Sequence, residues 1–184
     1  MTQRGTGQPD TARLFDELLV THVQSGDRRA GERLAARWHP RLMRTANRLL
    51  RDEEMARSAV QDTWISILRS IASLRDPSRF APWAFGILRR RCADGIRQAQ
   101  ARRSRLGEMP PDVATPATGE ETIDLREAFD ALPHDQRLAA QLFFVEGLTL
   151  AEIAEVQDIP TGTAKSRIFH ARQKLKAALT GDDQ

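Results

Sequence analysis

Apolar residues recur three and four positions apart along much of this chain, and this periodicity limits the possible folds more than any other feature. Side chains at this spacing share one face of an α-helix, as a buried stripe requires. The first expected stripe contains Leu14, Phe15, Leu18 and Leu19. Aromatic residues make up only 5% of the chain and tyrosine is absent, so the composition typical of β-strands is missing. The sequence therefore predicts an all-α protein.

Breaks in this periodicity predict two small helical domains joined by a flexible linker. Pro77 interrupts the first domain, because proline disfavours helix in the residue before it. A stretch between residues 107 and 119 contains three prolines, lacks any period and predicts the linker. Further breaks are expected at Pro133, Gly147 and Pro160. The expected boundaries are 1–11 for a disordered leader, 12–104 for the first domain, 105–122 for the linker and 123–180 for the second domain.

Charge is distributed unevenly, although the net value is only +3. Residues 86–105 hold seven arginines against the single acid Asp94, and residues 160–179 hold five cations and no acid. Residues 108–135 between them are acidic. Two separated cationic surfaces favour two contacts with a polyanion. A solvated helix face would explain one such run equally well.

Several classes of function are disfavoured by what the sequence contains. Cys92 is the only cysteine, so we expect no internal disulfide and no multi-thiolate metal site, and we expect Cys92 to be a small buried residue. The four histidines lack metal-ligand spacing, and there is no glycine-rich phosphate loop. We therefore expect neither an enzyme nor a cofactor. No apolar run is long enough to cross a bilayer, so we expect no membrane insertion and a cytoplasmic location.

The segment from Leu148 to Leu179 predicts a helix-turn-helix that reads the major groove of DNA. Thr149 is a suitable N-cap, and Glu152 completes the spacing of a capping box. The turn is expected at residues 157–159, where Asp158 tolerates left-handed geometry. An ordinary αα-hairpin is the alternative. In the second helix Ala164, Ile168 and Ala171 are expected to pack inward, leaving Thr163, Lys165, Ser166, Arg167, Phe169 and His170 facing outward or sideways.

This C-terminal half resembles the fourth domain of a bacterial extracytoplasmic-function (ECF) RNA polymerase sigma factor. The resemblance is carried by Leu142-Phe-Phe-Val-Glu-Gly-Leu148 and by Gly162-Thr-Ala-Lys-Ser-Arg-Ile-Phe-His-Ala-Arg172. It implies that this helix-turn-helix reads the minus-35 promoter element. The implied contacts come from Thr163, Lys165, Ser166, Phe169 and His170, with Arg167 and Arg172 nearer the phosphates.

The N-terminal half resembles the second domain of the same family, in Val60-Gln-Asp-Thr-Trp64, Phe80-Ala-Pro-Trp83 and Ile87-Leu-Arg-Arg-Arg-Cys-Ala-Asp94. The first motif implies docking on core RNA polymerase through Gln61, Asp62, Trp64 and Leu68. The others imply melting and capture of the minus-10 strand by Arg79, Phe80, Trp83, Arg89, Arg90, Arg91 and Arg97, with the loop 73–80 lining a base pocket. The alternative for Trp64 and Trp83 is a purely structural place in the core.

One segment departs from the family pattern. Members of this family usually carry Asp-Ala-Glu-Asp before the docking motif, whereas this chain has Met55-Ala-Arg-Ser58. Arg57 would repel the basic face of the polymerase clamp. Phosphorylation of Ser58 or Thr63 would restore negative charge. Alternatively, Glu53 and Glu54 supply that charge from one turn away.

Taken together, these features predict a sigma factor that binds core RNA polymerase and promoter DNA and is controlled by an anti-sigma factor or another regulator. It would have no catalytic chemistry of its own. Two other hypotheses are an autonomous helix-turn-helix regulator that dimerises through its N-terminal helices, and a sigma-like module that sequesters an anti-sigma factor. The first of these predicts binding to a palindromic operator without polymerase.

Overall fold

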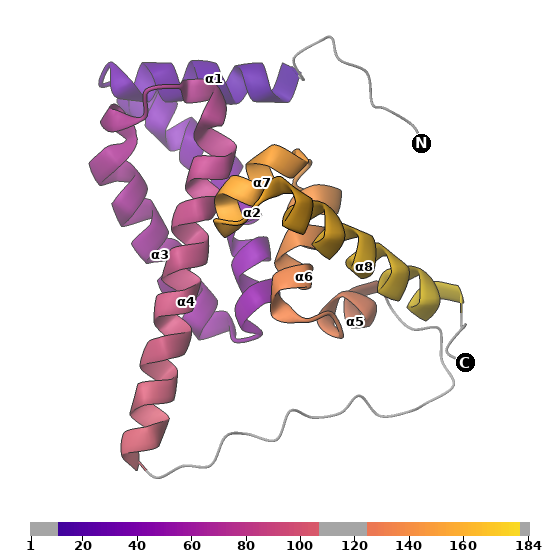
Figure 1. The fold of residues 1–184 in the computed structure, drawn as a ribbon. Coiled ribbons are helices and arrows are strands. Elements are labelled where there is room, and N and C mark those ends of the chain that lie inside the picture. Colours follow the sequence, from indigo (N-terminus) through magenta and orange to yellow (C-terminus); the bar gives the residue numbers. More distant parts are fainter. Residues whose placement is uncertain (1–10, 107–124, 181–184) are drawn as a thin grey trace.

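The computed structural model describes residues 11–106 and 125–180, and within these ranges every regular element is helical (Figure 1). The expected leader, apart from Thr11, and the expected linker from residue 107 onward lie outside the described residues. The elements are α1 Thr11–Gln24, α2 Arg28–Leu50, α3 Glu53–Ser70, η1 Ile71–Ser73, η2 Pro77–Arg79, α4 Phe80–Leu106, α5 Leu125–Asp130, α6 His134–Ala140, a π-helical turn η3 Gln141–Val145, α7 Leu150–Gln157 and α8 Thr161–Thr180.

Aspartate caps set the starts of three of these elements. The side chain of Asp27 accepts hydrogen bonds from backbone N–H groups in the first turn of α2, and Asp52 does the same for α3. Asp76 caps the short 3₁₀ turn η2, where Pro77 occupies the first position. The predicted break at Pro77 is therefore confirmed as a change of direction between α3 and α4.

The core of the first domain is built around Trp38 of α2, whose side chain is fully buried. Its ring meets Phe80 edge-on, with 4.9 Å between centroids, and lies 5.7 Å from Phe85. Both phenylalanines come from the first turns of α4, so the indole ties α2 to the start of that helix. The C-terminal half of α4 extends beyond the other helices of this domain (Figure 1).

The prediction for α1 is wrong about which of its faces is buried. Leu14, Phe15 and Leu18 are 47%, 44% and 52% exposed, whereas Leu19 is 4% exposed and Val20 is fully buried. Asp16 is buried on the same face as Leu19 and accepts a 2.5 Å hydrogen bond from Nε of Arg37. Both sides of this helix carry apolar residues, and contact with α2 decides which side turns inward.

The second domain is organised around a buried arginine. Arg137 of α6 donates hydrogen bonds to the backbone carbonyls of Phe129, Asp130 and Leu132, and thereby fixes the turn between α5 and α6. These carbonyls lie at the end of α5 and in the turn that follows it, where the helix itself supplies few donors, and the buried guanidinium supplies additional ones. After η3, Gly147 takes a positive φ of 71°, which confirms the predicted break there.

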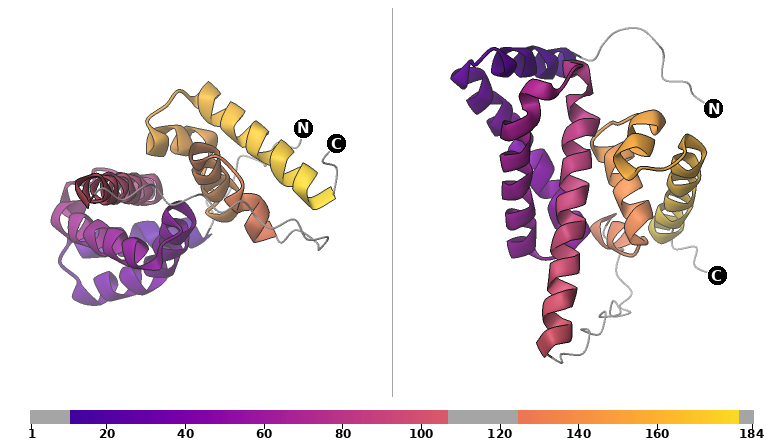
Figure 2. Two further views of the ribbon diagram at one scale, coloured as in Figure 1. Left: turned by 90° about the horizontal axis from the view of Figure 1, so that it is seen from below. Right: turned by 60° about the vertical axis from the view of Figure 1, so that its left-hand side comes forward.

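The two domains pack against each other. Helix α7 lies on α4, and α6 lies beside α2, as both views of Figure 2 show. Leu138, Leu142, Leu148 and Ile153 of the second domain belong to the same buried cluster as Trp38 and its neighbours. Nothing in the sequence pattern predicted this shared core, because its contacts join residues about a hundred positions apart.

Candidate functional site

The helix-turn-helix has the local geometry that its sequence predicts. Oγ1 of Thr149 accepts from the backbone N–H of Glu152 at 3.3 Å, and Oε2 of Glu152 accepts from the N–H of Thr149 at 2.7 Å. This is the predicted capping box at the start of α7. Asp158 ends the helix with a φ of 55°, so the predicted left-handed turn is confirmed.

Helix α8 has one packed face and one exposed face. Ala164, Ile168 and Ala171 are buried, as predicted. Among the described residues of α8 there is no acidic side chain, so the exposed face is cationic. Phe169 is 56% exposed and stacks edge-on against His170. The exposed side chains are Lys165, Ser166, Phe169, His170 and Arg172, while Thr163 is half-buried.

Arg167 differs from its neighbours because its guanidinium is bound within the domain. It donates to Oε1 of Gln157 at 2.6 Å and to Oδ2 of Asp135 at 2.8 Å. Nε2 of Gln157 in turn donates to the backbone carbonyl of Asp135 at 3.0 Å. The three residues join α6, α7 and α8. The sequence pattern placed Arg167 near the phosphates. It did not predict the contacts with Gln157 and Asp135, because these residues lie on other helices and no local pattern connects them to Arg167.

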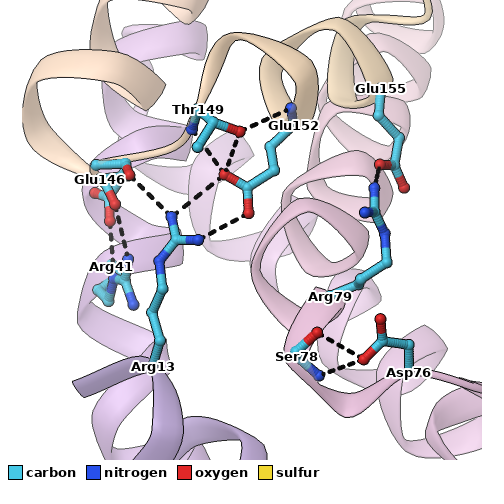
Figure 3. Close-up of polar contacts among 10 residues, drawn as sticks. Arg13, Arg41, Asp76, Ser78, Arg79, Glu146, Thr149, Glu152 and Glu155 are labelled. Atoms are coloured by element: carbon cyan, nitrogen blue, oxygen red, sulfur yellow. Dashed lines mark hydrogen bonds and ion pairs between the residues drawn. The ribbon is translucent and has the colours of Figure 1, made fainter. Parts of the chain in front are cut away.

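The residues expected to capture the minus-10 strand fall into different environments at the start of α4. Phe80 is 1% exposed and packs on Trp38, so it faces the core rather than a DNA strand. Trp83 is half-buried, 5.9 Å from Phe80 between ring centroids. Arg79 is exposed on the loop and forms an ion pair with Glu155 of α7 (Figure 3).

The arginines further along α4 form a cationic surface with one internal acid. Arg90 and Arg97 are exposed, and Arg97 pairs with Asp94. Arg91 donates to Oγ of Ser66 on α3 at 2.8 Å and lies 3.7 Å from Asp94. Arg89 is half-buried. The pattern predicted the positive charge correctly, and the base pocket at the loop 73–80 stays a prediction.

The residues expected to dock on polymerase lie on α3. Gln61 and Asp62 are exposed, Leu68 is 67% exposed, and Trp64 is half-buried. Trp64 and Leu68 border an apolar groove of about 460 Å³ between α2 and α3, which also contains Pro40. An exposed leucine beside an apolar groove is a feature of protein interaction surfaces.

The departure from the family pattern also lies on α3. Arg57 pairs with Glu53 one turn earlier, at 3.3 Å. Ser58 is exposed, whereas Thr63 is fully buried and donates its hydroxyl to the backbone carbonyl of Ala59 at 2.7 Å. Of the two proposed phosphorylation sites, only Ser58 presents its hydroxyl at the surface.

Neither a cluster of metal-ligating side chains nor a membrane-spanning helix occurs among the described residues. Within 11–106 and 125–180 no group of histidine, cysteine and acidic side chains is placed to hold a metal ion. Cys92 is buried, as expected, and its burial raises the pKa of the thiol to about 12. In the same part of the chain, no helix is long and apolar enough to cross a membrane.

Comparison with known proteins identifies both domains. The sigma-70 region 2 family matches residues 34–102, and the sigma-70 region 4 family matches residues 122–175. The chain is 34% identical over 164 residues to the ECF RNA polymerase sigma factor SigM of Mycobacterium tuberculosis, covering 89% of this chain and 83% of SigM. It is 32% identical over 179 residues to the ECF RNA polymerase sigma-E factor of Haemophilus influenzae, covering 89% and 94% of the two chains.

Solved structures give the same result. CnrH, solved in complex with the cytosolic domain of CnrY, is similar with a TM-score of 0.66 and 25% identity over 92% of this chain and 99% of CnrH. The sigma factor RpoE of Bartonella quintana, solved with the anti-sigma factor NepR, has a TM-score of 0.68 and 25% identity over 83% and 98%. The region 2 match accounts for the N-terminal helices that an autonomous regulator would use to dimerise. The chain belongs to the ECF RNA polymerase sigma factors, non-enzymatic proteins that direct RNA polymerase to promoters.

Proposed function

We propose that this sigma factor reads the minus-35 element through the exposed face of α8, with Lys165, Ser166, Phe169, His170 and Arg172 as contacts and Thr163 at the edge. The observation that carries the proposal is a helix whose outward face has cations, a hydroxyl and an aromatic ring but no acid. Such a face supplies both base-edge and phosphate contacts. Arg167 is assigned to positioning the helix, since its donors are already bound to Gln157 and Asp135.

A promoter library tests this proposal. Core RNA polymerase is reconstituted with the full chain on DNA carrying randomised minus-35 and minus-10 elements, and the transcribed templates are sequenced. Lys165→Ala and His170→Ala should relax the enriched minus-35 sequence. Lys174→Ala is a matched control, because Lys174 is exposed on the same helix but outside the proposed contact set. Unchanged enrichment in both variants would overturn the assignment.

The minus-10 function is assigned to the exposed arginines of α4, namely Arg90, Arg91 and Arg97, together with Trp83 and Arg79. A cationic track beside an aromatic side chain suits a single strand, because every base has a face that can stack. Phe80 supports this surface from the core by fixing the start of α4 on Trp38. Arg89 is half-buried and therefore contributes at the edge.

Docking on core polymerase is assigned to the face of α3 that carries Gln61, Asp62 and Leu68, beside the groove bordered by Trp64. The pair between Arg57 and Glu53 supports the simpler explanation for the missing acidic cluster, because Glu53 offsets the charge of Arg57 locally. Phosphorylation at the exposed Ser58 stays a second proposal. Phosphorylation of Thr63 would require α3 to unpack.

The solved structure of a similar sigma factor supports the proposal that a protein regulates this chain. The sigma factor RpoE was solved with the anti-sigma factor NepR, and we infer a comparable anti-sigma factor or another regulator for this chain. We also infer a cytoplasmic location, where both core polymerase and promoter DNA are found.

A further inference from the structure

Four arginines gather at the C-terminal end of α2. Arg44 and Arg48 lie one turn apart on this helix, Arg51 follows its last residue, and Arg137 comes from α6, which lies beside α2 (Figure 1). Burial lowers the pKa of Arg137, and the positive charges of Arg51 and Arg48 lower it further. The opposing effect of Asp130 does not cancel this fall. The end of α2 is therefore a region of positive potential.

Three of these arginines line one cavity, which we call the arginine pocket. Its volume is about 620 Å³, and it contains Arg44, Arg48 and Arg51 together with the exposed side chain of Asn47. Pockets that bind small molecules have volumes of about 300–1,000 Å³. The other lining residues are the acids Asp52, Glu53 and Asp130.

The three acids of the arginine pocket have other partners. Asp52 is the N-cap of α3, and its side chain accepts from a backbone N–H in the first turn of that helix. Glu53 pairs with Arg57 at 3.3 Å. The carboxylate of Asp130 acts on the buried Arg137, whose charged form it favours. None of these contacts neutralises the arginines that line the pocket.

Most of the donors of the lining arginines are unused. In the described ranges 11–106 and 125–180, no carboxylate lies within ion-pair distance of the guanidinium of Arg48 or Arg51. Arg48 lies over the ring of Phe129, 4.7 Å from the centroid, and such stacking leaves the N–H edges of a guanidinium free. Arg44 reaches Glu146 at 3.3 Å, and its side chain is 49% exposed.

Arg51 has a backbone conformation that favours glycine. It ends α2 with a φ of 56°, in the left-handed region. The Cβ atom of an L residue is disfavoured there, and glycine is the usual residue where a helix ends in this way. Glycine would relieve the strain but would also remove one of the two unpaired cations of the pocket. A role for the side chain would account for an arginine at this position.

The spacing of the arginines matches an anion longer than one phosphate. Arg44 and Arg51 are seven residues apart, which is about 10 Å along the helix axis at about 1.5 Å per residue. Guanidinium groups bind phosphate oxygens through paired N–H donors. Donors spread over this distance suit a chain of two or three linked phosphates better than a single phosphate.

We propose that the arginine pocket is a binding site for a small oligophosphate, with Arg44, Arg48 and Arg51 as phosphate ligands and Asn47 as a further donor. The chemistry that it recognises is a chain of linked phosphates, whether in a nucleoside triphosphate or in inorganic tripolyphosphate. The site does not depend on the proposed promoter contacts, because none of its lining residues belongs to α4 or α8.

Calorimetric titration of the full chain tests the site, without polymerase or DNA and at constant ionic strength. Tripolyphosphate should bind with one site per chain, and orthophosphate should bind about tenfold more weakly or less. Arg48→Gln and Arg51→Gly should each weaken tripolyphosphate binding by about tenfold or more. Arg33→Gln is the matched control, because Arg33 is exposed on α2 outside the pocket.

A second titration, with ATP, identifies the source of the phosphate chain. Tighter binding of ATP than of tripolyphosphate would assign the site to a nucleotide, and equal or weaker binding would assign it to the phosphate chain alone. Asp130→Asn should tighten the binding of either probe, because it removes a negative charge from the lining.

Thermal unfolding separates loss of binding from loss of folding. Without ligand, Arg51→Gly should unfold at the Tm of the parent or above it, because glycine relieves the left-handed strain. Saturating tripolyphosphate should raise the Tm of the parent but not that of Arg51→Gly. Equal binding of tripolyphosphate and orthophosphate by the parent would overturn the proposal. Equal losses in Arg33→Gln and Arg48→Gln would do so too, since they would show attraction to overall charge.

Discussion

Arg167 on helix α8 donates a 2.6 Å hydrogen bond from Nη1 to Gln157 at the end of α7, and its Nη2 donates to Asp135 on α6. One guanidinium therefore sets the angle between the two helices of the helix-turn-helix. If Arg167 positions α8 in this way, replacement of Asp135 should impair promoter reading as replacement of Arg167 does.

Asp135→Ala should impair minus-35 reading, because it removes the carboxylate that accepts from Arg167, although it also removes a negative charge near DNA. Each lost hydrogen bond of this kind costs roughly 0.5–1.5 kcal/mol of stability. Promoter-specific run-off transcription and urea unfolding of the same variant check this. An arginine that only contacted phosphate would give the opposite result, because removal of the acid would then increase DNA affinity.

Thr149→Ala should destabilise α7 by about 1 kcal/mol, because it removes the hydroxyl that accepts from the N–H of Glu152. Thr149→Ser is the matched control, since serine caps equally well. Equilibrium unfolding in urea measures the difference. Equal stability of the alanine and serine variants would contradict the capping box as a source of stability.

The pair between Arg13 and Glu152 should make stability depend on acid pH. Burial raises the pKa of Glu152, but hydrogen bonds from Thr149 and Arg13 outweigh this, so the pKa lies below its usual value. The stabilisation is complete above the unfolded-state pKa of about 4.3 and is lost as the pH falls through the lower folded value. Unfolding free energies from about pH 6 to about pH 3 should therefore fall less steeply in Arg13→Gln than in the parent. Parallel curves would show that the pair contributes nothing.

Ser58 and Thr63 should respond differently to a fixed negative charge. Thr63→Asp places an unpaired carboxylate in the core and should cost about 3–5 kcal/mol, whereas Ser58→Asp at the surface should change stability by less than about 0.5 kcal/mol. Thermal unfolding measures both. Binding to core polymerase then tests the regulatory idea: tighter binding by Ser58→Asp supports it, and unchanged binding by Ser58→Asp counts against it.

Local sequence signals predicted the elements whose causes are local. The spacing of Thr149 and Glu152 predicted the capping box, and Asp158 and Pro77 marked turns that the structure contains. Each depends on residues within one helical turn. The inward face of α8 was predicted as well, because only one of its faces is apolar and small.

Features set by distant partners could not be predicted in this way. Both faces of α1 are apolar, so only its packing on α2 shows that Leu19 turns inward and Leu14 does not. Phe80 and Arg79 are adjacent in the sequence, yet Phe80 lies in the core and Arg79 pairs with Glu155. A motif identifies such residues but does not say what each one touches.

The position of Arg41 should make the fluorescence of Trp38 sensitive to the contact between the two domains. Its guanidinium lies between the indole of Trp38 in region 2 and the carboxylate of Glu146 in region 4. Separation of the domains removes the carboxylate and changes the electric field across the indole. If the domains separate, the emission spectrum of Trp38 should therefore shift, and replacing Trp64 and Trp83 by phenylalanine isolates this signal.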